Sequence, residues 1–353
     1  MKPINQSTVH LVGSVPMDTT ADVLDACARE VGHLVAALPD GEPNERSAWV
    51  NYQALRVFYS HPQLDTVRRP EPVDGQDQWI PKGLDDMWQF ELKKGVDHLS
   101  FDDLHYAGAA IGSYLTFREL RDAAVIPPDV RFQISLPLTD SATVWFFADK
   151  RTRDLAVPAY QRAMIGELEK IFLAIPPEDV SIQWDVCFEV LDVEGAVPWS
   201  PDDDPMGRYR RTVHTLSEAV PEEALVGYHL CYADLGHHHF KEPADLTTSV
   251  IMANATVEAA ARRTDYFHVA VPRDRTDDAY FAPLEELDIG EARLFLGLVH
   301  YTDGLDGTAA RIEAARKHLT EFGISTECGF GRRPSEQVRR LLAIHREASA
   351  QLA

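Results

Sequence analysis

A histidine and two cysteines are the residues of this chain whose types and spacing could do metal chemistry. His229 and Cys231 lie two residues apart in an apolar segment, and Cys328 lies near the C-terminus. Because alternate residues of a strand point to the same face, the first two side chains could reach one point. Imidazole and thiolate ligands suit Zn²⁺, and ligands from separate elements are typical of a catalytic zinc site with an open position. Two inert buried cysteines near a core histidine would give the same pattern.

The elements that would position these residues alternate between short β-rich runs and helical patterns. We predict strands at 8–15, 97–101, 131–138, 180–191, 224–232, 266–271, 293–300 and 323–328. Helices are predicted at 20–38, 158–175, 206–219, 246–262, 308–322 and 335–350. This alternation favours a parallel sheet with right-handed crossovers. About eight repeats predict one α/β domain over residues 1–353, a (β/α)₈ TIM barrel; a doubly wound open sheet is the alternative.

Residues 39–96 are too long and too irregular to be a plain connection. They are rich in proline, aspartate and glutamine, with a predicted helix near 48–59. A connection of this length predicts an elaborated N-terminal βα insertion with a function, such as a lid. The polar loop Asp40–Arg46 and the aromatic Trp49 follow the first predicted helix. This order would put them at the end of the barrel opposite the site, unless the insertion folds back over the mouth.

Polar residues end several of the predicted strands, which is where the active site of a barrel lies. The predicted set around one site comprises Ser14, Asp185, His229, Cys231, His300 and Cys328. His300 and Asp303 could serve as acid or base, or simply cap the next helix. Asp185 could bind substrate or pair with an arginine of the barrel. Arg332 could hold an anionic substrate group or sit at a helix start.

The overall composition excludes several classes of partner. The formal net charge of −22 argues against nonspecific binding to nucleic acid or to an anionic membrane. Four cysteines in 353 residues do not make a disulfide scaffold. No stretch approaches the roughly 18 apolar residues of a membrane span, and the first ten residues lack the apolar core of a signal peptide. We therefore expect a soluble, reduced, cytoplasmic protein.

Several of these segments resemble motifs of one enzyme family. Gly13–Pro16 resembles the G-S-F-P motif of the cobalamin-independent methionine synthases, and Ile182–Asp185 resembles their I-Q-x-D-E-P strand. His229–Tyr232 resembles the H-x-C-Y zinc motif of that family, and Glu327–Gly329 resembles its final D-C-G. Gly297-Leu-Val resembles the seventh strand. The order and spacing agree with the catalytic barrel over nearly the whole chain, within the superfamily that includes uroporphyrinogen decarboxylase.

The resemblance implies a set of site residues. Zinc would be held by His229, Cys231 and Cys328, together with a glutamate at the end of the sixth strand. Ala270 stands where that glutamate is expected. His268, two residues earlier on the same face, could replace it; otherwise the fourth position is left to water or substrate. Asp185 would bind the ammonium group of an amino-acid thiol, and the other substrate-binding residues would be Ser14, Tyr232 and Arg332. Val186-Cys187 stands in place of the E-P that follows the family's aspartate.

The function implied is transfer of an alkyl group, most simply a methyl group, to a thiol such as homocysteine. A free thiol has a pKa of about 8.5, and coordination to zinc removes its proton and leaves a zinc-bound thiolate nucleophile. The donor would be a folate, a corrinoid protein or a methylated small molecule. The alternatives are a zinc-dependent carbon–sulfur lyase, a decarboxylase of the metal-free branch, and a non-catalytic zinc- or corrinoid-binding protein with a degenerate site.

Overall fold

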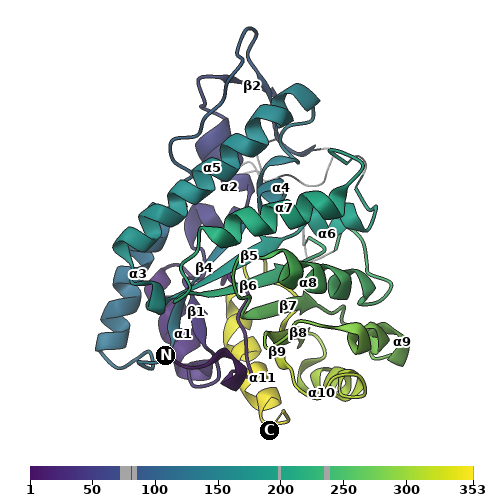
Figure 1. Ribbon diagram of the computed structural model, residues 1–353. Helices are drawn as coiled ribbons and strands as arrows, with labels where there is room; N and C mark the ends of the chain where they lie inside the picture. The colour runs from purple at the N-terminus through teal and green to yellow at the C-terminus, as the bar shows by residue number, and fades with distance from the viewer. Residues whose placement is uncertain (72–80, 82–85, 198–199, 234–238, 353) are drawn as a thin grey trace.

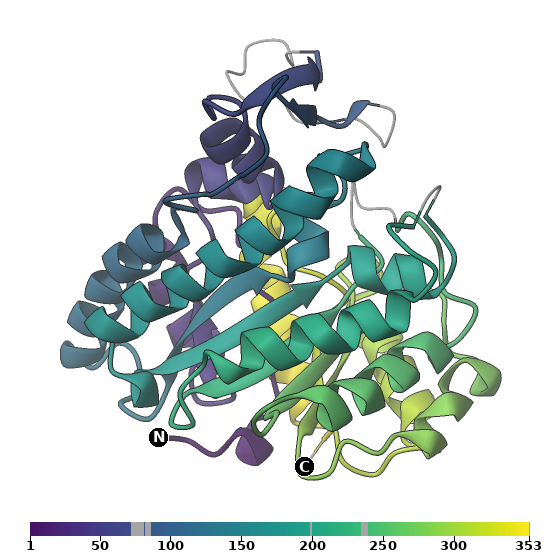
Figure 2. The same cartoon turned by 45° about the horizontal axis from the view of Figure 1, so that its top comes forward.

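The core of the protein is a curled, parallel β-sheet of seven strands (Figures 1 and 2). The computed structural model describes residues 1–71, 81, 86–197, 200–233 and 239–352. The strand order is β1-β4-β5-β6-β7-β8-β9. These strands are β1 (Ala37–Pro39), β4 (Arg131–Pro137), β5 (Val180–Val186), β6 (Leu225–Leu230), β7 (Tyr266–Ala270), β8 (Arg293–Val299) and β9 (Gly323–Thr326). The mixed α/β class and the parallel sheet predicted from the sequence are confirmed, and the curl is consistent with a TIM-like barrel.

Helices follow the strands in the chain, and neighbouring helices pack on one another. The longer ones are α1 (Thr20–Val31), α3 (Tyr106–Asp122), α5 (Lys150–Ala174), α7 (Pro205–Glu218), α8 (Thr247–Ala259), α10 (Gly304–Ala315) and α11 (Val338–Ser349). Short helices are α2 (Asn51–Gln53), α4 (Thr139–Thr143), α6 (Phe188–Val193) and α9 (Asp278–Phe281). The last helix, α11, contacts the first, α1, and α1 also contacts α3. Figure 1 shows α5, α7 and α8 crossing in front of the sheet.

The predicted first strand, residues 8–15, is an extended segment with isolated bridges to both edges of the sheet. Val9 bridges Ile324 of β9, and Ser14 bridges Gly41, which lies just beyond β1. The backbone N–H of His10 donates to the carbonyl of Ile324 at 2.9 Å. The bridges are single residues, so the segment does not form a continuous ladder with either edge strand.

The prediction of a second strand at residues 97–101 was wrong. Residues 97–101 form no strand, and the strand that pairs with β4 is β1, with Ala37 opposite Arg131. The first helix therefore ends at Val31 and not at residue 38. This correction moves the polar loop after residue 39 to the C-terminal end of a strand, which is the end where the predicted site lies.

Other differences from the sequence prediction include the end of one strand and one helix that was missed. The strand predicted at 180–191 ends at Val186, and α6 begins at Phe188. The helix α3 was not predicted at all. Its sequence is interrupted by glycines at positions 108 and 112, which weaken the helical pattern. Packing of Tyr114 and Phe117 against Phe132 of β4 compensates for that low propensity.

The segment between β1 and α3 carries a two-stranded hairpin of β2 (Leu64–Arg68) and β3 (Gln89–Leu92), which lies at the top of Figure 1. Residues 72–80 and 82–85 of the predicted insertion lie outside the described residues. Phe58 contacts Phe90, Phe146 and Phe147, so a buried aromatic cluster attaches this segment to the chain between β4 and α5. Within the part of the chain that the structure describes, no helix is both long and apolar enough to cross a membrane.

Candidate metal centre

Three candidate metal ligands converge at the C-terminal ends of the strands. His229 is in β6, Cys231 follows that strand directly, and Cys328 follows β9. One ligand atom from each residue lies within 4.8 Å of the other two. Nε2 of His229 is 3.8 Å from Sγ of Cys328. His229 and Cys231 are buried and Cys328 is partly exposed. The structure therefore brings together the imidazole and the two thiols that the sequence singled out.

The surroundings of Cys328 favour its thiolate form. Hydrogen bonding with Cys231 and then with His229 lowers the pKa of the Cys328 thiol well below its usual value, although burial opposes this shift. The positive charge of Arg332 acts in the same direction. Cys187 lines the same pocket, but burial raises the pKa of its thiol well above the usual value. Cys187 is therefore a protonated thiol beside a site that favours an anion at Cys328.

His268 lies next to the three-residue group but is not part of it. Strand register sets His268 of β7 opposite His229 of β6, and their Nδ1 atoms are 2.6 Å apart. Nε2 of His268 is 2.9 Å from the carbonyl oxygen of Thr326. Burial and the neighbouring His229 lower the pKa of His268 well below its usual value, so the ring is neutral. Ala270, at the position of the expected glutamate, places a buried methyl group there.

Two carboxyl groups face the same pocket, that of the buried Asp185 and that of the half-buried Glu42. Burial raises the pKa of Asp185, at the end of β5, to about 6, while His229 acts in the opposite direction. Burial, reinforced by the charge of Asp185, raises the pKa of Glu42 to about 8. Nε2 of Gln183 donates to Oδ1 of Asp185 at 2.9 Å, and the Trp49 side chain also hydrogen-bonds this carboxyl group. A cation that entered the pocket would relieve the repulsion between the two carboxylates.

Sequence reasoning missed Glu42 because it assigned the preceding residues to a helix. Asp40 holds the loop: it accepts hydrogen bonds from the backbone N–H of Glu42 at 3.0 Å and from Arg46 at 2.6 Å. Its carboxylate also accepts from Ser113 of α3 at 2.7 Å. The signal was present in the sequence, since four apolar residues, Val35–Leu38, are followed after Pro39 by an Asp-Gly turn pair.

The pocket between these groups is small. Its volume is about 50 Å³, enough for a few waters or for the reacting end of a small molecule. Oγ of Ser14 lies at its wall and accepts from the backbone N–H of Gly331 at 3.3 Å. Tyr232 is buried and does not line the pocket. The lining residues are Val12, Gly13, Ser14, Glu42, Ser47, Trp49, Asp185, Cys187, His229, Cys231, Ala233, Cys328, Gly329, Gly331 and Arg332.

Three non-glycine residues of the pocket wall have a positive φ angle. The φ angle is 54° for Glu42, 50° for Trp49 and 60° for Ala233. Such conformations cost on the order of 1–3 kcal/mol each and gather at functional sites, where the surrounding structure maintains them. The strain here marks the two loops, after β1 and after β6, that face each other across the pocket.

His300 and Asp303 lie outside this pocket. Nε2 of His300 donates to the carbonyl of Val271 at 2.9 Å, and its Nδ1 is 3.7 Å from the carboxylate of Glu327. Burial lowers the pKa of His300 to about 3. Both His300 and Glu327 line a neighbouring cavity of about 480 Å³. Asp303 is paired with Arg311 through two hydrogen bonds of 2.7 and 2.9 Å, which outweigh burial and lower the pKa of its carboxyl group.

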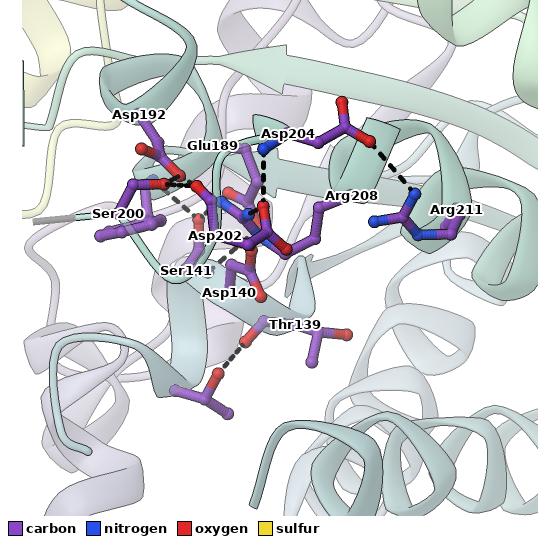
Figure 3. Close-up of polar contacts among 12 residues, drawn as sticks. Thr139, Asp140, Ser141, Glu189, Asp192, Ser200, Asp202, Asp204, Arg208 and Arg211 are labelled. Carbon is purple, nitrogen blue, oxygen red and sulfur yellow. Dashed lines mark hydrogen bonds and ion pairs between the residues drawn. The ribbon is translucent and has the colours of Figure 1, made fainter. Parts of the chain in front are cut away.

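A buried ion-pair network supports the loops beside Asp185 (Figure 3). The guanidinium of Arg208 in α7 contacts three aspartates, which are Asp140 of α4, Asp192 of α6 and Asp202. Oγ of Ser141 donates to Glu189 at 2.5 Å and accepts from the backbone N–H groups of Cys187 and Phe188 at 2.9 and 3.0 Å. Burial and the charge of Asp140 raise the pKa of Glu189 to about 7. These contacts fix the turn at Val186-Cys187, between β5 and α6.

Comparison with known proteins shows the fold. No protein-family model matches the chain, and no curated protein matches its sequence. A B12-independent methionine synthase from Shewanella sp. W3-18-1, solved in complex with selenomethionine, has a TM-score of 0.59 at 12% identity, covering 98% of this chain and 97% of that chain. A candidate vitamin-B12 independent methionine synthase from Listeria monocytogenes has a TM-score of 0.57 at 12% identity, covering 100% of this chain and 99% of that chain. Over its whole length, the chain therefore has the fold of these methionine synthase structures.

Proposed function

We propose that this protein is a zinc-dependent enzyme that transfers an alkyl group, most simply a methyl group, to the sulfur of a small thiol such as homocysteine. The observation that carries the proposal is the convergence of His229, Cys231 and Cys328 in a small pocket that also holds two carboxyl groups. The shared fold with methionine synthase structures supports the same class of reaction. The donor would be a folate, a corrinoid protein or a methylated small molecule.

The donor set fits zinc. Two thiols and one imidazole lie within 4.8 Å of one another, and the Cys328 thiol already favours its anionic form. Three such ligands with one open position are a known arrangement of catalytic zinc sites. Bound zinc would supply a positive charge that lowers the pKa of a substrate thiol and keeps it nucleophilic at neutral pH. The methyl group of Ala270 offers no ligand atom, so the fourth position would be left for the substrate sulfur.

The remaining pocket residues would select and orient an amino-acid thiol. Glu42 and Asp185 would bind its ammonium group, because a cation between the two carboxylates offsets their repulsion and their desolvation. Arg332 would attract its carboxylate, and the Ser14 hydroxyl would contact the same end of the substrate. These contacts would hold the sulfur in one position relative to an incoming alkyl group, which lowers the entropic cost of the reaction.

His300, with Glu327 beside it, would exchange a proton with the donor from the neighbouring cavity. The neutral ring, with Nε2 held by the carbonyl of Val271, would first take up at Nδ1 the proton that the substrate thiol loses and would then give it to the leaving group of the donor. Asp303 accepts two hydrogen bonds from Arg311 and would stabilise the start of α10.

We also propose that residues 8–15 complete an eight-stranded barrel over one domain of residues 1–353. Residues 39–96 would be the insertion that borders its mouth.

The proposal is tested by incubating the zinc-loaded protein with homocysteine and a panel of methyl donors, and detecting methionine by mass spectrometry. Methylated thiol should form with at least one donor, and Cys231→Ser should abolish it. Cys27→Ser is the matched control, because Cys27 is a buried cysteine of α1 outside the pocket. If no donor in any of the three classes supports product formation above the Cys231→Ser background, the transferase assignment is wrong.

A further inference from the structure

His268 contacts His229 on the side of the ring that faces away from the thiols. The Nδ1 atoms of the two rings are 2.6 Å apart, whereas Nε2 of His229 is directed to Sγ of Cys328 at 3.8 Å. Both rings are buried, with 3% exposure for His229 and 0% for His268. Two imidazole nitrogens this close in a dry interior must share a hydrogen bond, so one donates and the other accepts.

The third member of the chain of contacts determines which nitrogen donates. The carbonyl oxygen of Thr326 can only accept, so Nε2 of His268, 2.9 Å away, carries its proton. In a neutral ring, Nδ1 of His268 is then the acceptor, and Nδ1 of His229 must be the donor. That leaves Nε2 of a neutral His229 without a proton and directed toward the thiols, which is the form of imidazole that binds a metal. A proton that this nitrogen holds toward the Cys328 thiolate in the metal-free protein leaves when a metal binds.

We propose that His268 is a positioning residue that holds His229 as an Nε2 metal ligand, and that it is not itself the fourth ligand. Both ring nitrogens of His268 are engaged, one with His229 and one with the carbonyl of Thr326. Ligation by His268 would require one of these buried hydrogen bonds to break. Metal-binding histidines usually donate their other N–H to a carboxylate, a carbonyl or water. Here the acceptor is a second imidazole, that of His268, which in turn donates to the backbone carbonyl of Thr326.

The contact also connects two of the candidate ligands across the inside of the curled sheet. His268 is on β7 and Thr326 is the last residue of β9, with β8 between them in the strand order. Oγ1 of Thr326 donates to the carbonyl of Cys328 at 2.6 Å. The residue that anchors His268 therefore also holds the backbone of the second thiol ligand. A change at His268 should disturb the orientation of His229 without removing a ligand atom.

The first experiment needs no metal, so it separates this inference from the proposed function. In the metal-free protein labelled with ¹⁵N-histidine, two-dimensional NMR distinguishes the Nδ1–H and Nε2–H tautomers. His229→Gln and His268→Gln difference spectra assign the two signals. We expect Nδ1 of His229 to carry a proton, whether or not Nε2 also carries one toward the Cys328 thiolate, and His268 to be the Nε2–H form. If His229 is found as the Nε2–H tautomer in the wild-type protein, the inference is wrong, whatever the protein binds.

The second experiment measures zinc affinity by chelator competition, and the ligand atoms by X-ray absorption. His268→Ala should weaken zinc binding about 10- to 100-fold, the usual effect of losing such a partner. In His268→Ala the protein ligands of the zinc should still be two sulfurs and one histidine nitrogen. His268→Gln, whose amide can accept from His229 and donate to Thr326, should recover part of the affinity, and added imidazole should recover part of it in the alanine variant.

His345→Gln is the matched control for these measurements. His345 is also fully buried, but its Nδ1 contacts the carbonyl of Leu341 within its own helix. The His345→Gln variant should bind zinc with the affinity of the wild type. The inference would be overturned if the zinc of the wild type had two histidine nitrogens as ligands and lost one of them in His268→Ala, because His268 would then be a ligand. An unchanged affinity in His268→Ala would overturn it as well.

Discussion

At the scale of single residues, the paired carboxyl groups of Glu42 and Asp185 determine how the pocket responds to pH. Their pKa values, about 8 and about 6, are raised mainly by burial, so both groups are partly protonated near neutrality. Asp185 could be predicted from its position at the end of a strand. Glu42 was missed because β1, the strand before it, has only three residues, fewer than a period-two pattern needs to be recognised, so the Asp-Gly turn pair was the only local sign of the strand end.

We predict that the affinity for an amino acid without a thiol, such as 2-aminobutyrate, rises from pH 5 to pH 8.5. An ammonium group binds best to ionised carboxylates, so affinity is low while both are protonated and increases as the pH passes about 6 and then about 8. Glu42→Gln should remove the upper step and keep the lower one. Isothermal titration calorimetry across this range measures both.

The control is Glu45→Gln, because Glu45 is an exposed residue of the same loop that pairs with Arg56. Its pH profile should match that of the wild type. An affinity that does not change between pH 5 and 8.5, or a profile of Glu42→Gln that still shows both steps, would contradict the assignment of Glu42 to the ammonium site.

At the scale of elements, the Arg208 network holds α4, α6 and α7 together beside the pocket. Two of its carboxylates are almost fully buried, with 3% exposure for the side chain of Asp140 and 2% for Asp192, whereas the third, Asp202, is 46% exposed. The sequence indicated the strands that precede α4 and α6, but not this network. Its members lie far apart along the chain, and an arginine on a helix gives no sign of its partners.

Arg208→Met should destabilise the protein at pH 7 by about 3–5 kcal/mol, because it leaves buried carboxylates without a counter-charge. Arg211→Met on the same helix is the control. Arg211 is 65% exposed and pairs with Asp204 at 3.4 Å, so its loss should cost no more than about 1 kcal/mol. Urea unfolding measures both changes.

The cost at Arg208 should shrink as the pH falls, because burial raises the pKa values of Asp140 and Asp192 and protonation removes their unpaired charge. Equal costs for the two arginine variants at pH 7 would show that the network does not stabilise this part of the fold.

The turn after β1 gives a second prediction at this scale. Gly41 has a φ of +83°, and an added Cβ would lie 2.6 Å from Cγ2 of Val23 in α1. Gly95 has a similar φ of +85°, but nothing lies within 4 Å of such an atom. Gly95→Ala should therefore cost only the strain of a left-handed alanine, about 1 kcal/mol. Gly41→Ala should add an overpacking cost of about 1–3 kcal/mol.

Thermal unfolding of the two glycine variants measures this difference. Gly41→Ala should also weaken amino-acid binding, because Glu42 follows directly in the chain. The same stability for both variants would show that the turn can shift without cost, and that it does not hold Glu42 in place.

At the scale of the whole molecule, the alternation of apolar runs and helical patterns was enough to predict a parallel α/β sheet. The pattern could not locate β1, because its apolar residues continue the stripe of the preceding helix. The pattern also could not predict contacts between the two ends of the chain, such as the bridge between Val9 and Ile324. Pairing over such separations depends on the curl of the complete sheet and leaves no local signal.

The central claim is that His229, Cys231 and Cys328 together hold zinc. It is tested most directly by metal content, measured by mass spectrometry on protein purified without a histidine tag or added metal. We predict about one zinc per chain in the wild type and in Cys27→Ser, and almost none in Cys231→Ser or Cys328→Ser. A wild-type protein that carries no zinc and takes up none on titration would contradict the claim, as would full zinc occupancy in both pocket cysteine variants.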